Sequence, residues 1–268
     1  MDAVIVIIGG MGPMAGAECF KYIASNSKTN GTDQSNLDVM LVSFPSRIVN
    51  RVDFVLGRTD VNPATSVLEF IKPQFQALSA SYKRILVGVP CITFHCPCCF
   101  SVFREEVRSL FPNVEIVSII TSTVSFVNRY FPEVHRIGIM STDGTRHAKP
   151  FRQEFSSHSI QIVYLTDDQQ RIVTECIYNV HWSSFLCCVM RRGMKSLTFD
   201  QVRAHSLLCD VMDQLLQEEC DAILLGCTEI PLAIPETEYK GVPVLNASWM
   251  MAHELVRRAD PRKLKPFK

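Results

Sequence analysis

Two cysteines lie in nearly the same local sequence, each directly after a short apolar segment and a turn residue. Cys227 follows the apolar residues 222–225 and a glycine, and Cys91 follows the largely apolar residues 85–89 and a proline. Such unalternating apolar segments are typical of parallel strands that are covered on both faces. Free backbone N–H groups where a strand turns into a helix can stabilise a thiolate and bind a carboxylate. The pattern therefore predicts two thiols at the ends of buried strands, with Cys227 close to the N-terminus of a short helix.

Each cysteine alone has a simpler interpretation, because free cysteine is among the most buried residue types. The spacing of the two cysteines favours a catalytic role instead. The cysteines are 136 positions apart, and the similar segments 4–10 and 136–142 lie at a comparable offset of 132. Two pairs of segments at nearly one offset indicate a duplicated α/β unit. Such a duplication would bring Cys91 and Cys227 face to face.

Two thiols on opposite sides of a carbon atom can invert it by proton transfer, because one acts as base while the other acts as acid. A proton on such a carbon is very weakly acidic, so the site must exclude water and stabilise the negative charge that develops on the substrate. Thr93 and Thr228 follow the two cysteines closely and are placed for this role. Arg51 can hold a second carboxylate through a bidentate pair, whereas Arg47 and Arg58 are better explained as surface residues.

The first strand is predicted at residues 4–8 and is followed by a glycine-rich loop and a helix over 15–25. The loop resembles a dinucleotide site, but the acid that would bind a ribose is not at the end of the second strand, because Asp38 precedes that strand. We therefore interpret Met11 and Gly12 as part of a loop for a substrate or a small anion. A structural turn is the alternative.

The rest of the chain alternates predicted strands and helices, as expected of an α/β fold. Further strands are predicted at residues 39–43, 84–90, 113–120, 134–140, 161–165, 222–225 and 242–245. Helices are predicted from Asn62, over 97–110, 171–193 and 199–220, and from a Ser248 cap to residue 258. Hydroxyls at residues 121–123 can bind an anion or cap the next helix, and capping is the commoner use.

The chain has 268 residues, of which 47% are hydrophobic, so it can form one large domain or two small ones. No Gly, Ser or Pro linker separates two parts, which predicts tightly packed halves. We assign residues 1–112 and 240–268 to the first α/β subdomain and 113–239 to the second. The 27 basic and 27 acidic residues balance, so nucleic acid is not expected as a partner.

No apolar segment approaches the roughly 20 residues of a membrane span, and the N-terminus has no leader pattern, so a cytoplasmic protein is expected. Eleven cysteines should then be mostly reduced thiols. The cluster of His95, Cys96, Cys98 and Cys99 invites a zinc interpretation. It lacks the paired spacing and second pair of a structural zinc site, so no metal is predicted.

Three segments together resemble the aspartate/glutamate racemase superfamily, which is independent of pyridoxal phosphate. They are GGMGP after the first strand, PCITFH around Cys91 and LGCTEIP around Cys227. The resemblance extends from Ile7 to about Ala252. It implies two pseudo-symmetric α/β subdomains with parallel sheets and an active site in the cleft between them. It also implies no cofactor, a small amino-acid or dicarboxylate substrate, and a homodimer.

The family's functional residues have counterparts in this chain. The resemblance implies that Cys91 and Cys227 are the catalytic acid/base thiols. It implies a set of substrate-binding residues: Met11, Gly12, Arg51, Thr93, Thr123 and Thr228. Arg51 resembles the arginine that aspartate-specific members place near the substrate's acidic side chain.

The chain departs from the family pattern in three places. Ile92 stands where the family has an asparagine after the first cysteine, and Phe94 replaces a small residue, so both could shape a less polar pocket. The lysine that aspartate racemases carry after an Ile-Tyr pair is missing, because Tyr178 is followed by Asn179. An insertion spans residues 183–198.

These observations lead to one main hypothesis, an amino-acid racemase that acts on aspartate, glutamate or a related acid. Two alternatives stay open. One is single-cysteine chemistry, as in maleate isomerase-like or arylmalonate decarboxylase-like members of the superfamily. The other is a protein that binds an amino acid without turning it over.

Overall fold

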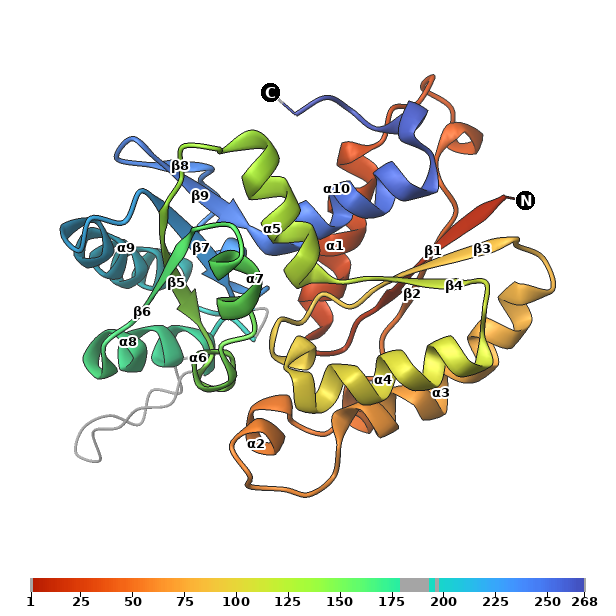
Figure 1. Ribbon diagram of the computed structural model, residues 1–268, viewed down its shortest axis with the longest axis horizontal. Coiled ribbons are helices and arrows are strands. Elements are labelled where there is room, and N and C mark those ends of the chain that lie inside the picture. Colours follow the sequence, from red (N-terminus) through yellow and green to blue (C-terminus); the bar gives the residue numbers. More distant parts are fainter. Residues whose placement is uncertain (1, 179–192, 196–197, 268) are drawn as a thin grey trace.

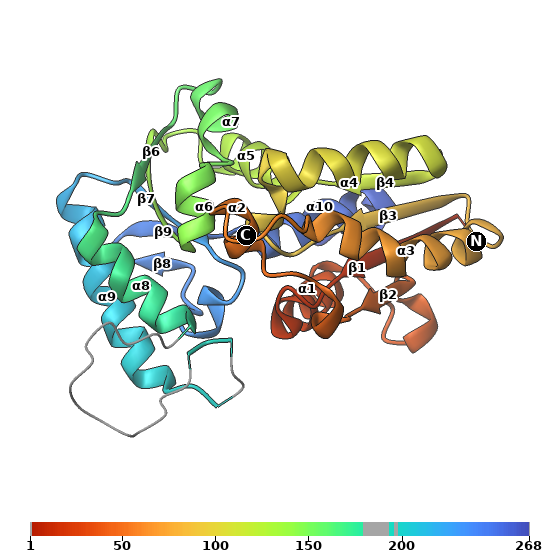
Figure 2. The same ribbon diagram turned by 90° about the horizontal axis from the view of Figure 1, so that it is seen from below.

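The computed structural model describes residues 2–178, 193–195 and 198–267, which form two α/β halves side by side (Figures 1 and 2). The first sheet has the order β2-β1-β3-β4 and is parallel throughout. Its strands are β1 (Ala3–Ile8), β2 (Val39–Val42), β3 (Arg84–Gly88) and β4 (Val114–Val117). The predicted α/β class with parallel sheets is confirmed.

Helices cover both faces of the first sheet, which explains why its strands are apolar without alternation. Ile5, Ile7 and Leu86 pack toward α1 and α10, whereas Val4, Val6 and other residues on the opposite face pack toward α3 and α4. The helices of this half are α1 (Pro13–Asn26), α2 (Arg51–Val55), α3 (Pro63–Ser79) and α4 (Pro97–Leu110), with α10 (Ala247–Ala259) returning from the end of the chain.

The second sheet has the order β6-β5-β7-β9-β8 and is parallel except where β8 pairs with β9. Its strands are β5 (Arg136–Ser141), β6 (Gln161–Tyr164), β7 (Ala222–Gly226), β8 (Glu238–Tyr239) and β9 (Val242–Asn246). Its helices are α5 (Ile119–Tyr130), α6 (Asp143–Ala148), α7 (Arg152–Ser156), α8 (Asp167–Tyr178) and α9 (Gln201–Gln217). Helices α8 and α9 cover the face that points away from the first half (Figure 2).

Short 3-10 helices complete the fold. They are η1 (Asp33–Ser35), η2 (Pro45–Arg47), η3 (Thr93–His95), η4 (Ile230–Leu232) and η5 (Pro261–Lys263). Two of them matter for the site, because η3 and η4 follow the strands β3 and β7 that carry the two cysteines.

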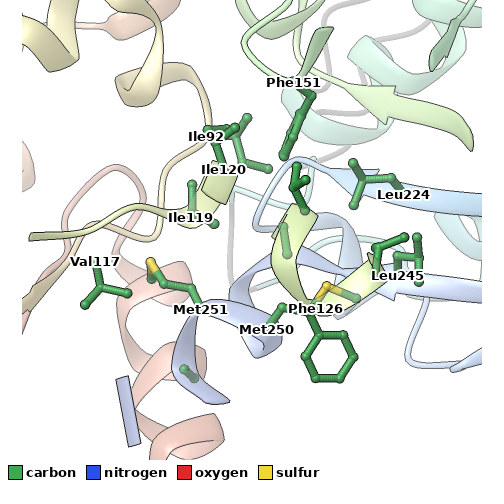
Figure 3. Close-up of a cluster of buried hydrophobic side chains, with 14 of the residues drawn as sticks. Ile92, Val117, Ile119, Ile120, Phe126, Phe151, Leu224, Leu245, Met250 and Met251 are labelled. Atoms are coloured by element: carbon green, nitrogen blue, oxygen red, sulfur yellow. The ribbon is translucent and has the colours of Figure 1, made fainter. Parts of the chain in front are cut away.

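One hydrophobic cluster joins the halves (Figure 3). Ile92 and Val117 enter it from the first half, and Leu224 and Leu245 enter it from the second. Helices α5 and α10 pack against each other within this cluster. The halves are therefore held together by a shared apolar core.

Strand pairing corrects the predicted subdomain boundaries of 1–112 with 240–268 and of 113–239. Strand β4 pairs with β3 and belongs to the first sheet, whereas β9 pairs with β7 and belongs to the second. The chain crosses between the sheets at Ser118 and Asn246, whose side chains cap α5 and α10. Apolar residues continue across both crossings, so the sequence alone did not mark them.

Three local predictions are also corrected. The strand predicted over 113–120 ends at Val117, so residues 121–123 lie inside α5 and neither cap it nor end a strand. Asn246 caps α10 by accepting a hydrogen bond from Trp249 N at 3.1 Å, and Ser248 does not. The helix predicted over 171–193 begins earlier, at Asp167, and its part beyond Tyr178 falls mostly outside the described residues.

Within the described ranges, no helix is long and apolar enough to cross a membrane.

Candidate active site

The two cysteines occupy equivalent places in the two sheets. Strand β3 lies between β1 and β4, and strand β7 lies between β5 and β9. Cys91 follows β3 after a two-residue turn, and Cys227 follows β7 directly. Both side chains are buried, with 5% and 4% exposure. The local prediction of two thiols at the ends of central strands therefore agrees with the fold.

Tyr178, at the described end of α8, connects the two cysteine turns electrostatically. Burial raises the pKa of its hydroxyl, and ionisation of Cys227, Glu229 or Cys91 would raise it further, while Arg51 acts in the opposite direction. The Tyr178 hydroxyl therefore lies close enough to both thiols and to Arg51 for their ionisation to affect its pKa. The two halves bring these groups into one site.

Cys227 is held as a neutral thiol. Its Sγ donates to Glu229 Oε2 at 3.1 Å. Burial raises the pKa of Cys227 well above its usual value, Glu229 raises it further, and Lys195 lowers it only in part. This corrects the expectation that the turn stabilises a thiolate, because η4 is a single 3-10 turn and a carboxylate two residues away outweighs its N–H groups.

Glu229 is the centre of the hydrogen-bond network and has 2% exposure. Its Oε1 accepts from Gly12 N at 3.0 Å and pairs with Lys195 Nζ at 2.7 Å. Its Oε2 accepts from Cys227 and, at 3.3 Å, from Thr228 Oγ1. Burial alone would raise the pKa of Glu229, but the charge of Lys195 and these hydrogen bonds lower it. Glu229 is therefore a buried carboxylate.

The predicted substrate loop lies against this network. A Cβ atom on Gly12 would come within 2.9 Å of Glu229 Oε1, so only glycine allows this close approach. Met11 is 2% exposed, and its carbonyl oxygen accepts from Arg51 Nη2 at 3.2 Å. The loop thus contacts both the carboxylate and the arginine.

Arg51 begins α2 and has only neutral partners. Its Nη1 donates to Val49 O at 3.5 Å, in addition to the bond to Met11. Its Nε is buried without a hydrogen-bond partner, and no carboxylate within the described chain pairs with the guanidinium. Arg51 therefore has capacity left for an anionic ligand.

The three predicted threonines differ in their surroundings. Thr93 Oγ1 lies 2.9 Å from the hydroxyls of both Thr142 and Thr145, so it connects η3 with α6. Thr228 donates to Glu229, as described above. Thr123 donates to Ile119 O at 2.7 Å within α5, so its hydroxyl proton is already engaged in a hydrogen bond inside the helix. The structure brings Thr93 and Thr228 to the cysteine turns and leaves Thr123 inside its helix.

The two apolar departures from the expected motif lie in hydrophobic cores. Ile92 is 2% exposed and packs into the cluster that joins the halves (Figure 3). Phe94 is fully buried and meets Phe103 edge-on, with ring centroids 5.5 Å apart. Both side chains are packed away behind the Cys91 turn.

His95 supports the same turn. Its Nδ1 donates to Cys91 O at 2.9 Å, and its Nε2 accepts from Ile119 N at 3.5 Å. Burial lowers the pKa of His95 to about 4, so the ring is neutral near pH 7. In the part of the chain that the structure covers, no three His, Cys, Asp or Glu residues are placed to hold a metal ion, and the cysteines are free thiols.

Sequence reasoning missed Lys195 and Glu229. The family pattern predicts a lysine directly after Tyr178, where this chain has Asn179. Lys195 reaches the site instead, from the far end of the insertion. Its backbone N–H donates to Ile177 O at 3.3 Å, which attaches this segment to α8. Glu229 had a visible signal, because it is part of the LGCTE segment after Cys227.

Comparison with known proteins identifies a family. The family model described as Asp/Glu/Hydantoin racemase matches residues 8–255. An uncharacterized protein in the pnlA 3' region of Pectobacterium carotovorum is 30% identical over 137 residues, which is 51% of this chain and 76% of that protein.

Solved structures share the fold. The Picrophilus torridus aspartate racemase has 23% identity and a TM-score of 0.75, over 98% of this chain and 96% of that one. A Francisella tularensis glutamate racemase in complex with D-glutamate has 13% identity and a TM-score of 0.59, over 100% and 84%. The allantoin racemase from Klebsiella pneumoniae has 13% identity and a TM-score of 0.56, over 99% and 91%.

Proposed function

Because this chain belongs to the Asp/Glu/hydantoin racemase family, we propose that it is a cofactor-independent racemase of aspartate, glutamate or a closely related acid. In this proposal Cys91 and Cys227 exchange the α-proton. The observation that carries it is the position of Arg51, a cation without an anionic partner in the described chain, within electrostatic reach of the Tyr178 hydroxyl that both thiols also affect.

Arg51 favours an acidic substrate for a physical reason. The Arg51 guanidinium is partly buried and has no counter-ion in the described chain, and a carboxylate can pair with it through two parallel hydrogen bonds. Lys195 adds a second positive charge, but Glu229 already neutralises it. A substrate with two carboxylates would supply one for Arg51 and one for the groups beside the thiols.

The burial of Ile92 and Phe94 supports the same choice. Before the fold is considered, two apolar residues beside Cys91 suggest a pocket for a neutral substrate. Both side chains are packed into cores, so they do not supply exposed apolar surface. The groups with unused capacity for a ligand are polar.

The proposed chemistry uses the two thiols in opposite protonation states. The Cys91 thiolate removes the proton from Cα, and the electron pair of the C–H bond stays on the substrate as an enolate-like carboxylate. The Cys227 thiol then delivers its own proton to the opposite face. Cys91 ends as a thiol and Cys227 as a thiolate, which the neighbouring Lys195 stabilises. In the reverse direction the two roles exchange.

The test is exchange of the α-hydrogen in D2O. Incubation with single enantiomers of aspartate or glutamate should introduce deuterium at Cα, and both Cys91→Ser and Cys227→Ser should abolish inversion. Activity retained in Cys227→Ser alone would point to single-cysteine chemistry. Thermal stabilisation by an amino acid without exchange would point to a binding protein. Absence of exchange across a broad panel of amino acids contradicts the proposal.

Substrate choice is tested with Arg51→Leu. Loss of a charge-assisted contact should lower kcat/KM for aspartate and glutamate by about one to two powers of ten and leave a neutral amino acid unaffected. Arg47→Leu is the matched control, because the Arg47 side chain is 52% exposed. Equal rates before and after mutation on all three substrates would show that Arg51 does not bind substrate.

The family resemblance extends the proposal to a homodimer in the cytoplasm. Sedimentation equilibrium of the purified protein tests the assembly. A single species of monomer mass at all concentrations would contradict it.

A further inference from the structure

A second cavity lies between α5 and α10, apart from the cysteine turns. Its volume is about 250 Å³. Ten residues line it, and none of them is part of the site described above. Those used below are Ser122, Ser125 and Arg129 on α5 and His253, Glu254 and Arg257 on α10.

His253 supplies an unsatisfied polar atom. The side chain is 3% exposed, and its Nε2 is buried without a hydrogen-bond partner. The ring is held by aromatic neighbours, with Phe126 edge-on at 5.1 Å and Trp249 at 5.5 Å between ring centroids. Buried polar atoms in proteins are nearly always paired, so this nitrogen has the capacity to bind a group in the cavity.

The charges around the cavity are unbalanced. Glu254 pairs with both Arg257 and Arg258, at 2.7 Å and 2.5 Å. Arg258 also pairs with Glu115, whereas Arg129 has no ion pair in the described chain. The residues that line the cavity therefore include three arginines and one glutamate, and Arg129 is not paired with that glutamate. Burial lowers the pKa of His253, Glu254 acts in the opposite direction, and Arg257 and Arg129 lower it further; all four residues line the same cavity.

Hydroxyl groups add further donors. Ser122 and Ser125 line the cavity from the same side of α5 as Arg129, at helical spacings of three, four and seven residues. Donors therefore approach the cavity from two helices, as hydroxyls, a guanidinium and an imidazole. This number of donors from two helices suits the several oxygens of a phosphate group better than the two oxygens of a carboxylate.

We propose that the cavity between α5 and α10 binds the phosphate group of a small phosphorylated molecule. Arg129 and Arg257 hold the charge, His253 Nε2–H and the two serines donate to the remaining oxygens, and Glu254 orients Arg257. The volume is below the ~300–1,000 Å³ of sites for drug-sized ligands, so the rest of the molecule is small or extends outward. This site does not depend on the proposed racemase activity.

The site has a defined place in the fold. Helices α5 and α10 each begin where the chain crosses from one sheet to the other, at Ser118 and Asn246. A phosphate held between them would bridge the two helices that follow these crossings. Binding should therefore raise the melting temperature of the whole protein by mass action.

Isothermal titration calorimetry with inorganic phosphate, glycerol 3-phosphate and citrate tests the proposal. The wild type should bind a phosphate compound saturably at one site. Arg129→Gln and His253→Phe should each weaken that binding at least about tenfold, because each removes a donor to a charged group. Arg171→Gln should bind as the wild type does, because Arg171 is an exposed arginine on α8 that pairs with Asp168.

The outcomes are distinct. Tighter binding of glycerol 3-phosphate than of phosphate supports a phosphorylated molecule, and equal binding supports free phosphate. No saturable binding of either, binding of citrate alone, or unchanged affinity in Arg129→Gln would overturn the proposal. Arg129 is exposed, so its variant keeps the fold even where His253→Phe does not.

Discussion

At the scale of single residues, Glu229 controls the protonation of the candidate active site. It contacts the Cys227 thiol, the Lys195 ammonium and the Gly12 amide with its two oxygens. The thiol faces a negative charge at 3.1 Å, which favours its neutral form. This neutral form is the one that the proposed mechanism requires of a proton donor.

We predict that Glu229→Gln moves the alkaline limb of the pH profile of kcat/KM to lower pH. In the proposed mechanism Cys227 donates a proton, so activity should be lost as pH rises through its pKa. The mutation removes a negative neighbour that raises this pKa and leaves Lys195, which lowers it. Glu236→Gln, which alters an exposed partner of His205, is the control. If the alkaline limb lies at the same pH in the wild type and in both variants, Glu229 does not affect the pKa of the proton donor.

His95 makes stability depend on pH. Burial lowers its pKa from 6.5 to about 4, so between these values the unfolded chain binds a proton that the folded chain does not. Stability is then complete above pH 6.5 and falls as pH drops toward 4. Relative to His95→Gln, the wild type should lose about 2 kcal/mol of unfolding free energy between pH 7 and pH 5. Urea unfolding of both proteins at both pH values measures this difference. Equal losses of unfolding free energy in the wild type and in His95→Gln would contradict the prediction.

At the scale of elements, the position of Cys227 depends on how closely β7 packs against β5. Gly226 is the last residue of β7, and a Cβ atom there would lie 2.6 Å from Ile139 Cγ1 and 2.9 Å from Met140 O. The second contact is to backbone, which cannot rotate away. The strand end therefore has no room for a side chain, and the place of the thiol follows from this packing.

Gly226→Ala should lower the free energy of unfolding by about 1–3 kcal/mol. It should also reduce the kcat of the molecules that stay folded, because β7 must shift and carry Cys227 with it. Gly138→Ala on β5 is the control. There the new Cβ meets the flexible end of the Leu215 side chain at 2.9 Å, so stability should fall while activity per folded molecule is kept. Denaturant titration and kinetics on the folded fraction compare the two. Equal effects on kcat would contradict the argument.

At the scale of the whole molecule, the site exists because the halves share a core and meet through polar contacts at its edge. Thr93 from the first half meets Thr142 and Thr145 from the second, and α2 packs against α6 beside them. Gly144 belongs to the same contact, since a Cβ on it would lie 2.9 Å from Thr93 Cγ2. This contact holds the Cys91 turn against the second half.

Thr93→Val should therefore lower the free energy of unfolding by about 1 kcal/mol, because a buried hydroxyl that joins the halves is lost without a change of shape. The exposed Thr121→Val should have no effect. Urea unfolding and KM are measured for both. A raised KM with unchanged stability would show that Thr93 serves the substrate alone and does not join the halves.

Much of this protein was determined by local sequence. The apolar segments before Cys91 and Cys227 predicted buried strands that end in turns, because a strand covered on both faces cannot carry polar residues. The helices after Asn62 and Pro97 begin near where their caps and prolines predicted. The motifs around the two cysteines also predicted the family correctly.

Other features were decided only by tertiary structure. Lys195 comes to Glu229 across 34 positions, and no local pattern encodes that contact. The neutral state of Cys227 depends on burial and on the distances to a carboxylate and an ammonium, which are properties of the assembled site. The crossings at Ser118 and Asn246 became visible only when strand pairing assigned β4 and β9 to their sheets. Strand pairing, burial and the distances between charges depend on residues that are far apart in the chain. The fold therefore determines these features, and the local sequence around each residue does not.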